Sequence, residues 1–134
     1  MSVVLDASLP LAWLLHEVSD EELDVVLDEV LHDGGLVTPL WQLEVLNGLL
    51  VAVKRGRITT AQLSEMLVAL EGLPLEQVEL DPSPYALLPL AREHGLTAYD
   101  ASYVWAASVT GCPLATRDEK MRAAAEAEGI ALLG

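Results

Sequence analysis

The chain has 134 residues, 52% of them hydrophobic, and carries a formal net charge of −14. This length suits a single domain, residues 1–134, that buries a core of its own, and a second domain is not expected. The strong negative charge argues against extensive nonspecific binding to DNA, because a protein that neutralises phosphates needs a basic face.

The cysteine content and the hydropathy of the chain favour an intracellular protein. Cys112 is the sole cysteine, so the chain cannot form an internal disulfide, which suits a reducing compartment. The first residues lack a basic leader and place a carboxylate, Asp6, too early for a signal peptide. No apolar run reaches the length that spans a membrane. We therefore expect a soluble, cytoplasmic protein with no membrane segment.

Short apolar strands are expected to alternate with helices. In chain order, the sequence predicts a strand at 3–5, helices from 8 and from 19, a strand at 36–38, helices at 40–54 and 59–71, a strand at 77–80, helices at 82–95 and 97–110, a strand at 113–116, a helix at 119–128 and a strand at 130–133. Strands separated by helices in this way indicate an α/β domain whose parallel sheet is covered on both faces.

Local signals mark several of the helix ends. Ser8 is expected to cap the first helix, and a capping box at 19–22 opens the second. Gly95 is expected to end the helix that begins near Pro82 and Pro84. The expected apolar face of the helix at 40–54 comprises Leu43, Leu46, Leu50 and Val53.

Four acidic residues stand where a hydrophobic strand ends or a hydrophobic helix begins. Asp6 and Asp118 follow strands, and Glu44 and Asp100 lie in the first turns of helices. Ligands bind beyond the carboxyl ends of the strands in open α/β sheets, so all four are candidates for one site. For Asp100 alone, a capping box with Thr97 explains its place about as well as a functional role. One cap cannot explain all four acids.

A cluster of four carboxylates needs protons or cations. Two unit charges about 5 Å apart, at an effective dielectric constant of about 20, repel each other by roughly 3 kcal/mol. Oxygen donors without paired His or Cys suit a hard cation, Mg²⁺ or Mn²⁺. His16, His32 and His94 lack the spacing of a metal motif, so helix-end or surface roles are expected for them.

Four stretches around these acids resemble the acidic motifs of PIN-domain ribonucleases. They are Val4-Leu5-Asp6-Ala7-Ser8, Glu44 with Asn47, Leu96-Thr97-Ala98-Tyr99-Asp100-Ala101-Ser102-Tyr103, and Ala115-Thr116-Arg117-Asp118. The similarity extends over nearly the whole chain. More narrowly, the chain resembles the toxin subunit of VapBC toxin–antitoxin modules.

This resemblance implies a PIN-like α/β fold of three layers, with a five-stranded parallel sheet flanked by helices. It implies an Mg²⁺-dependent endoribonuclease, with Mn²⁺ as a possible substitute, that acts as the toxin of a type II toxin–antitoxin system. A metal-activated water would cleave the phosphodiester bonds of RNA. It also implies a homodimer and a cognate, VapB-like antitoxin. A basic C-terminal segment is expected for that antitoxin, because the acidic cleft attracts cations.

We assign roles to the residues of these motifs as follows. The catalytic residues are Asp6, Glu44, Asp100 and Asp118, and among them Asp6 and Asp100 are expected to bind the metal directly. Asp118 is expected to hold the metal or a bound water, and Glu44 to orient the nucleophile or hold a second ion. The supporting hydrogen-bonding residues are Ser8, Asn47, Thr97 and Thr116. The substrate-binding residues are Arg117 and Lys120, which border Asp118.

Two other classes of function remain open at this stage. A metal-dependent phosphatase or phospho-acceptor domain would also use an Asp at a strand end. A dehalogenase-like phosphatase needs a second Asp two residues after Asp6, where this chain has Ser8, and a receiver domain needs an acidic pair at its first strand. The other class is a catalytically weak protein that only binds an antitoxin, whose acids receive a basic partner.

Overall fold

The computed structural model describes residues 2–15, 21–79 and 82–134. Its centre is a parallel sheet with the strand order β3-β2-β1-β4. The strands are β1 (Val3–Leu5), β2 (Gly35–Val37), β3 (Leu75–Gln77) and β4 (Leu114–Ala115). All three residues of β1 are fully buried, as expected for an apolar central strand covered on both faces. The α/β fold with a parallel sheet is confirmed.

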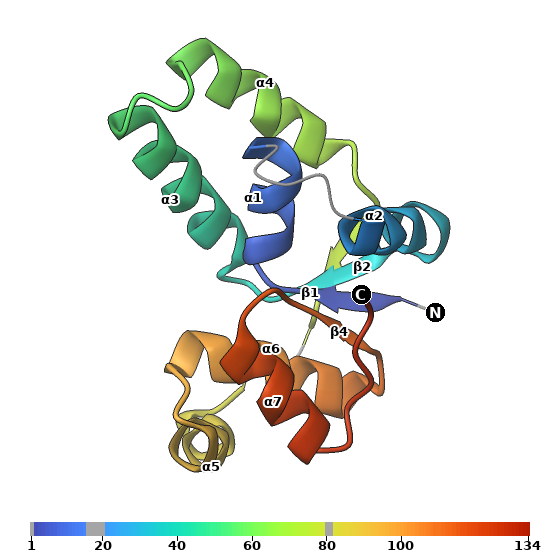
Figure 1. Cartoon of the computed structure of the whole chain (residues 1–134). Helices are drawn as coiled ribbons and strands as arrows, with labels where there is room; N and C mark the ends of the chain where they lie inside the picture. The colour runs from blue at the N-terminus through green and yellow to red at the C-terminus, as the bar shows by residue number, and fades with distance from the viewer. Residues whose placement is uncertain (1, 16–20, 80–81) are drawn as a thin grey trace.

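Helices cover the sheet from two sides (Figure 1). The helices are α1 (Ser8–Leu15), α2 (Glu21–Asp33), α3 (Trp41–Lys54), α4 (Thr60–Glu71), α5 (Pro84–His94), α6 (Ala98–Thr110) and α7 (Glu119–Ala127). Both α2 and α6 contact β1, and Figure 1 shows them on opposite sides of that strand. One group of helices lies on the side of α6, where α5 and α7 pack against α6. The second group, on the other side of the sheet, consists of α1, α3 and α4.

Several helix ends follow the local signals in the sequence. Thr59 and Gln62 form a capping box at the start of α4. Ser83 caps α5, whose first residue is proline, and Gly95 ends that helix with φ of 64°. Glycine adopts this left-handed conformation without the steric penalty that a side chain brings. The expected capping box at 19–22 begins outside the described residues, and α2 is described from Glu21.

The described sheet differs from the expected one in two places. The strand expected at 130–133 is reduced to one parallel bridge between Leu132 and Leu114, so the described sheet has four strands instead of five. The strand expected at 77–80 overlaps β3 only at Gln77: β3 begins two residues earlier, where the Pro74 carbonyl accepts a hydrogen bond from Gly35 N–H, and Leu80 lies outside the described residues. Both differences concern the margins of the sheet, where pairing with a neighbour rather than hydropathy decides the strand length.

The expected buried face of α3 is correct for Leu46 and Val53, which are partly buried against the core, and wrong for Leu43 and Leu50. Its buried residues are Trp41, Val45, Leu49 and Ala52, whereas Leu43 is 63% exposed and Leu50 is 51% exposed. The helix is apolar on nearly every side, so the periodicity does not identify a single face. No helix in the described ranges is long and apolar enough to cross a membrane.

Candidate active site

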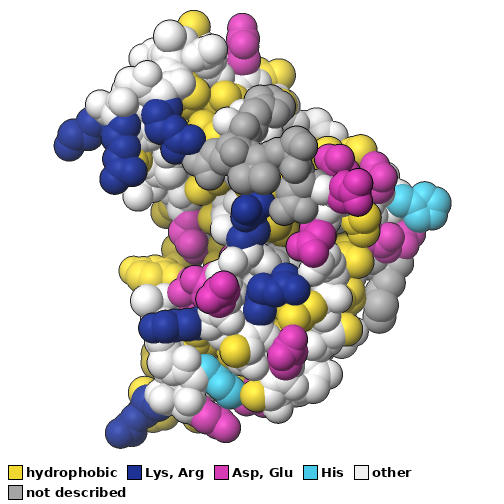
Figure 2. Space-filling model, viewed as in Figure 1, with side chains coloured by type: hydrophobic (Ala, Val, Ile, Leu, Met, Phe, Trp, Pro, Cys, Tyr) yellow, Lys and Arg dark blue, Asp and Glu magenta, His cyan; other side chains and the backbone are white. Residues whose placement is uncertain are grey.

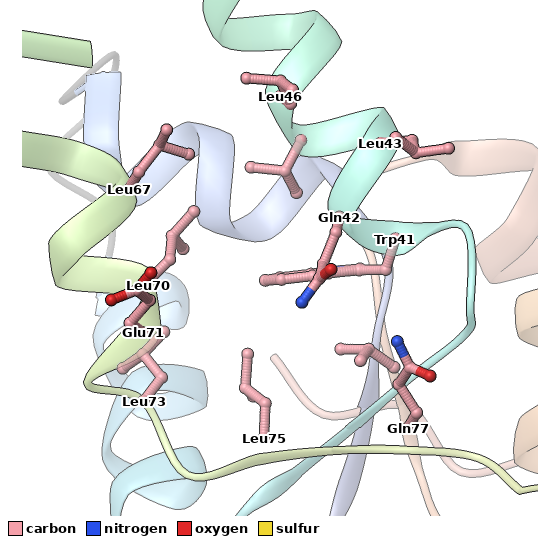
Figure 3. A pocket seen from close by; sticks show the side chains of 12 residues that line it. Trp41, Gln42, Leu43, Leu46, Leu67, Leu70, Glu71, Leu73, Leu75 and Gln77 are labelled. Atoms are coloured by element: carbon pink, nitrogen blue, oxygen red, sulfur yellow. The ribbon is translucent and has the colours of Figure 1, made fainter. Parts of the chain in front are cut away.

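Four acidic side chains line one cleft at the carboxyl ends of β1 and β4. The cleft has a volume of about 370 Å³, and its lining includes Asp6, Glu44, Asp100 and Asp118. Asp6 follows β1, Asp118 precedes α7, and the other two lie in the first turns of α3 and α6. Figure 2 shows acidic side chains gathered in the hollow between the two groups of helices. The fold therefore brings together acids that are far apart in the sequence.

Asp6 is the most deeply placed of the four, with 2% of its surface exposed. Its Oδ1 atom accepts hydrogen bonds from Ser8 N–H at 3.0 Å and from Ser8 Oγ at 2.6 Å. Its Oδ2 atom accepts a hydrogen bond from Thr116 Oγ1. Burial raises the pKa of Asp6, and the hydrogen bonds from Ser8 and Thr116 oppose that shift. The hydrogen bonds from Ser8 and Thr116 thus offset part of the effect of burial on this carboxyl group.

Ser8 and Thr116 connect Asp6 to the segment that carries Asp118. Thr116 Oγ1 accepts a hydrogen bond from Asp118 N–H at 3.0 Å, and Ser8 Oγ accepts one from Arg117 N–H at 3.2 Å. The expectation that Ser8 caps α1 is wrong, because Ser8 is the first residue of the helix and its hydroxyl donates to Asp6. The Asp6 carboxylate itself receives the amide of that first turn.

Glu44 is held by a residue that the sequence reasoning did not assign to the site. The hydroxyl of Tyr103 donates a hydrogen bond to Glu44 Oε1 at 2.9 Å. Partial burial raises the pKa of Glu44, the bond from Tyr103 lowers it, and the negative charges of Asp100 and Asp6 raise it. Tyr103 stands three residues after Asp100, a spacing that places the two side chains on neighbouring positions of α6.

Asp100 takes part in the start of α6 through its backbone N–H, and its side chain lies in the cleft; its functional role stays a prediction. Thr97 caps α6 by accepting a hydrogen bond from Asp100 N–H at 3.1 Å. The Asp100 side chain also lines the cleft. Partial burial raises the pKa of Asp100, the charge of Asp118 raises it further, and Thr97 opposes the shift.

The remaining candidate residues fall inside and outside the cleft. Asp118 caps α7 by accepting a hydrogen bond from Met121 N–H at 2.9 Å, and it lines the cleft. Asn47 also lines the cleft. Arg117 and Lys120 are exposed and are not among the lining residues, so the structure places them at the border of the site.

Comparison of the sequence with models of protein families identifies the family of the chain. The model of the PIN domain family matches residues 3–127. The chain belongs to the PIN domain family. PIN domains are generally nucleases, and these nucleases typically use divalent metal ions. No curated protein matches this PIN domain in sequence.

Two solved structures are similar to this PIN domain. The crystal structure of PAE2754 from Pyrobaculum aerophilum has 27% sequence identity and a TM-score of 0.72, with 92% of this chain and 84% of that chain covered. The crystal structure of FitAcB from Neisseria gonorrhoeae has 16% identity and a TM-score of 0.65, with 98% of this chain and 96% of that chain covered. At this identity, the second likeness shows the fold alone.

The donor atoms of the PIN-domain cleft fit a hard divalent cation bound in part through water. All four acidic groups offer oxygen, which Mg²⁺ and Mn²⁺ prefer. The four acids of the cleft do not have their oxygens within 4.8 Å of one another. Among the described residues, one group of three acidic, His or Cys side chains meets that distance, and it lies elsewhere. The wider spacing in the cleft suits Mg²⁺, which usually keeps several waters and binds one or two carboxylates directly.

The closer group consists of Glu93, His94 and Glu128, away from the cleft. His94 Nε2 lies 2.9 Å from Glu128 Oε1 and thereby connects the end of α5 to the end of α7. His32 is an exposed residue in the last turn of α2, and His16 lies outside the described residues. Sequence spacing could not reveal the pair of His94 and Glu128, because its members are 34 positions apart.

Proposed function

We propose that this PIN domain is a divalent-metal-dependent endoribonuclease that acts in the cytoplasm as the VapC-type toxin of a type II toxin–antitoxin system. The observation that carries the proposal is the convergence of four carboxylates on one cleft, with Asp6 buried and held by three hydrogen bonds. Without a cation, the ionised carboxylates repel one another strongly, and this repulsion lowers the free energy of unfolding of the domain. We infer that binding a metal and a phosphate is its purpose.

The hydrogen bonds of Asp6 indicate which of its oxygens faces a ligand. Oδ1 accepts two hydrogen bonds and Oδ2 accepts one. Because a carboxylate oxygen has about two lone-pair sites, Oδ2 keeps room for a cation. Asp6 and Asp100 are the proposed direct metal ligands, and Asp118 would hold the metal or a water bound to it. A bound Mg²⁺ or Mn²⁺ polarises the phosphate and lowers the pKa of the attacking water.

Glu44 is the proposed group that orients the water and receives its proton. Its Oε1 atom is occupied by the Tyr103 hydroxyl, so Oε2 is the atom available for the proton. Its raised pKa makes it a better proton acceptor than an ordinary glutamate. The proton leaves the water as the water oxygen forms its bond to phosphorus, and the bond to the leaving ribose oxygen breaks.

The proposed regulator is an antitoxin whose basic C-terminal segment enters the cleft. The net charge of −14 attracts cationic groups over about a Debye length. An Arg or Lys side chain there would make charge-assisted hydrogen bonds to the oxygens that otherwise bind the metal. We also propose that the protein is a homodimer, because α3 and α5 expose large apolar residues such as Leu43 and Leu88.

The test is an RNA-cleavage assay of Asp6→Asn and wild type, with and without Mg²⁺. The substitution should lower the Mg²⁺-dependent cleavage rate on the order of a hundredfold or more, because it removes charge at the metal. Glu65→Gln is the control, since Glu65 is an exposed acid on α4 and its loss changes the net charge equally. Full activity of Asp6→Asn, or equal activity of wild type without metal, would exclude this mechanism.

A further inference from the structure

Tyr103 is a buried tyrosine whose hydroxyl reaches across the acidic cleft. The residue is fully buried in the core, on α6. Its hydroxyl lies 2.9 Å from Glu44 Oε1, on α3, so the hydrogen bond joins the two helices that face each other across the site. A phenylalanine would fill the same space without the hydroxyl. The polar atom is therefore the feature that packing alone does not explain.

Glu44 depends on this one bond. Among the described residues, Tyr103 is the only side chain that hydrogen-bonds the Glu44 carboxylate, whereas Asp6 receives two hydrogen bonds from side chains and one from the Ser8 backbone N–H. The charges of Asp100 and Asp6 both act against the ionised form of Glu44. Without the phenol, a flexible side chain under repulsion from two neighbours would have no fixed position in the cleft.

Thr38 adds a second polar group beside the phenol. It follows β2 and is 5% exposed, and its Oγ1 atom has no hydrogen-bond partner within the described part of the chain. Burial raises the pKa of the Tyr103 phenol, and the nearby Thr38 hydroxyl opposes this rise. The high pKa keeps the phenol protonated at neutral pH, so Tyr103 acts towards Glu44 as a donor.

We propose that Tyr103 is a positioning residue, whose hydroxyl fixes Glu44 Oε1 and thereby presents Oε2 to the reacting water. The proposal rests on the ribonuclease function proposed above. Tyr103 itself touches neither metal nor substrate in this scheme. Its effect on the reaction passes entirely through Glu44, and this restriction makes the proposal testable with a double-mutant cycle.

The cycle consists of Tyr103→Phe, Glu44→Gln and the double variant, assayed for RNA cleavage in Mg²⁺. Tyr103→Phe should lower kcat about tenfold at unchanged KM, the usual size for losing a partner that orients a catalytic group. In the Glu44→Gln background, the same change should have no further effect. Tyr85→Phe is the matched control, because Tyr85 is 86% exposed on α5 and loses the same hydroxyl.

Two outcomes would overturn the positioning role. One is a kcat of Tyr103→Phe equal to that of Tyr85→Phe. The other is losses that multiply in the double variant, which would show that Tyr103 supports the fold rather than Glu44. Thermal unfolding of each variant checks that the proteins compared are folded.

A measurement without turnover separates this proposal from the function on which it rests. The ¹³C resonance of the Glu44 carboxyl carbon, recorded at pH 8, should move in Tyr103→Phe and stay in place in Tyr85→Phe. A wild type that cleaves no RNA would refute the proposed function, and the resonance would still decide whether Tyr103 holds Glu44. A resonance that stays in place in Tyr103→Phe would overturn the contact itself.

Discussion

The two sides of the acidic cleft are built differently. On the strand side, Asp6, Ser8, Thr116 and the backbone of Asp118 form one connected set of hydrogen bonds. On the helix side, Glu44 is held by the Tyr103 hydroxyl, and Asp100 is anchored through its backbone N–H to Thr97. The strand side is therefore held by one connected network of hydrogen bonds, whereas the helix side relies on two separate bonds.

The carboxyl groups on the two sides of the cleft also lie in different electrostatic environments. Asp6 is almost wholly buried, which raises its pKa, and the hydrogen bonds from Ser8 and Thr116 oppose that rise. Glu44 and Asp100 are only partly buried, and neighbouring acids contribute to the rise in their pKa values. The strand side is sensitive to the loss of a donor, and the helix side is sensitive to pH and to cations.

The largest effect is expected from breaking the strand side with Thr116→Val. This change keeps the shape of the side chain but removes the donor to Asp6 Oδ2 and the acceptor of Asp118 N–H. We expect a loss of about 1–3 kcal/mol in the free energy of unfolding, because buried polar groups lose their partner. RNA cleavage should fall about 10-fold to 100-fold. Urea denaturation and the cleavage assay measure the two effects.

Thr60→Val is the control for Thr116→Val, since Thr60 is exposed in the first turn of α4. If both threonine variants unfold at the same urea concentration, the hydrogen bonds around Asp6 do not stabilise the domain. The strand side would then be no more rigid than the helix side.

A smaller effect is expected from pH, which acts on all three acids with raised pKa values. Their ordinary values are 3.8 for Asp6 and Asp100 and 4.5 for Glu44. Because the folded pKa values are higher, the folded protein binds these protons more readily than the unfolded chain. Without divalent metal, this contribution to stability grows as pH falls from neutral through the raised values. It is complete below the ordinary values.

Asp100→Asn isolates this contribution from the general repulsion among the many acids of the chain. Urea denaturation from pH 8 down to the ordinary value of Asp100, 3.8, should show a smaller gain in stability for Asp100→Asn than for wild type. Excess Mg²⁺ should reduce the gain in wild type, because the cation favours the ionised carboxylates. Identical pH profiles for the two proteins would mean that Asp100 serves only as part of a helix start.

The smallest effect is expected from Thr38→Val, at the end of β2. Thr38 follows β2 and Thr116 follows β4, the two strands that flank β1. Both threonines are buried, but only the hydroxyl of Thr116 has hydrogen-bond partners among the described residues. Replacing the Thr38 hydroxyl by a methyl group should raise the free energy of unfolding by about 1 kcal/mol. Thermal and urea unfolding measure it, and a destabilised Thr38→Val would show that this hydroxyl has a partner after all.

The sequence predicted the place of the candidate site residues well where that place depends only on the end of a strand or the start of a helix. The rule for strand ends predicted the place of Asp6 and Asp118, and the helix starts predicted that of Glu44 and Asp100. The PIN-domain resemblance, confirmed by the family match, joined them into one site. The motif residues alone were enough to reach the family.

The sequence was less informative where contacts between distant residues decide. In the sequence, Tyr103 is indistinguishable from the other core residues of an apolar helix. Its hydrogen bond to Glu44 joins residues 59 positions apart. The buried face of α3 was partly misassigned, because Leu43 and Leu50 are as apolar as the residues that are buried. The last strand shrank to a bridge at Leu132, since pairing at a sheet margin depends on the neighbouring strand.

The hydrogen bond between Asp6 and Thr116 joins residues 110 positions apart. A ribosome makes Asp6 before Thr116, so the acidic cluster of a nascent polypeptide stays incomplete until the segment with Thr116 has been made. A chain truncated before Thr116 also lacks Asp118 and the donor that holds Asp6. The cleft therefore forms only after the segment that carries Thr116 and Asp118 has been translated.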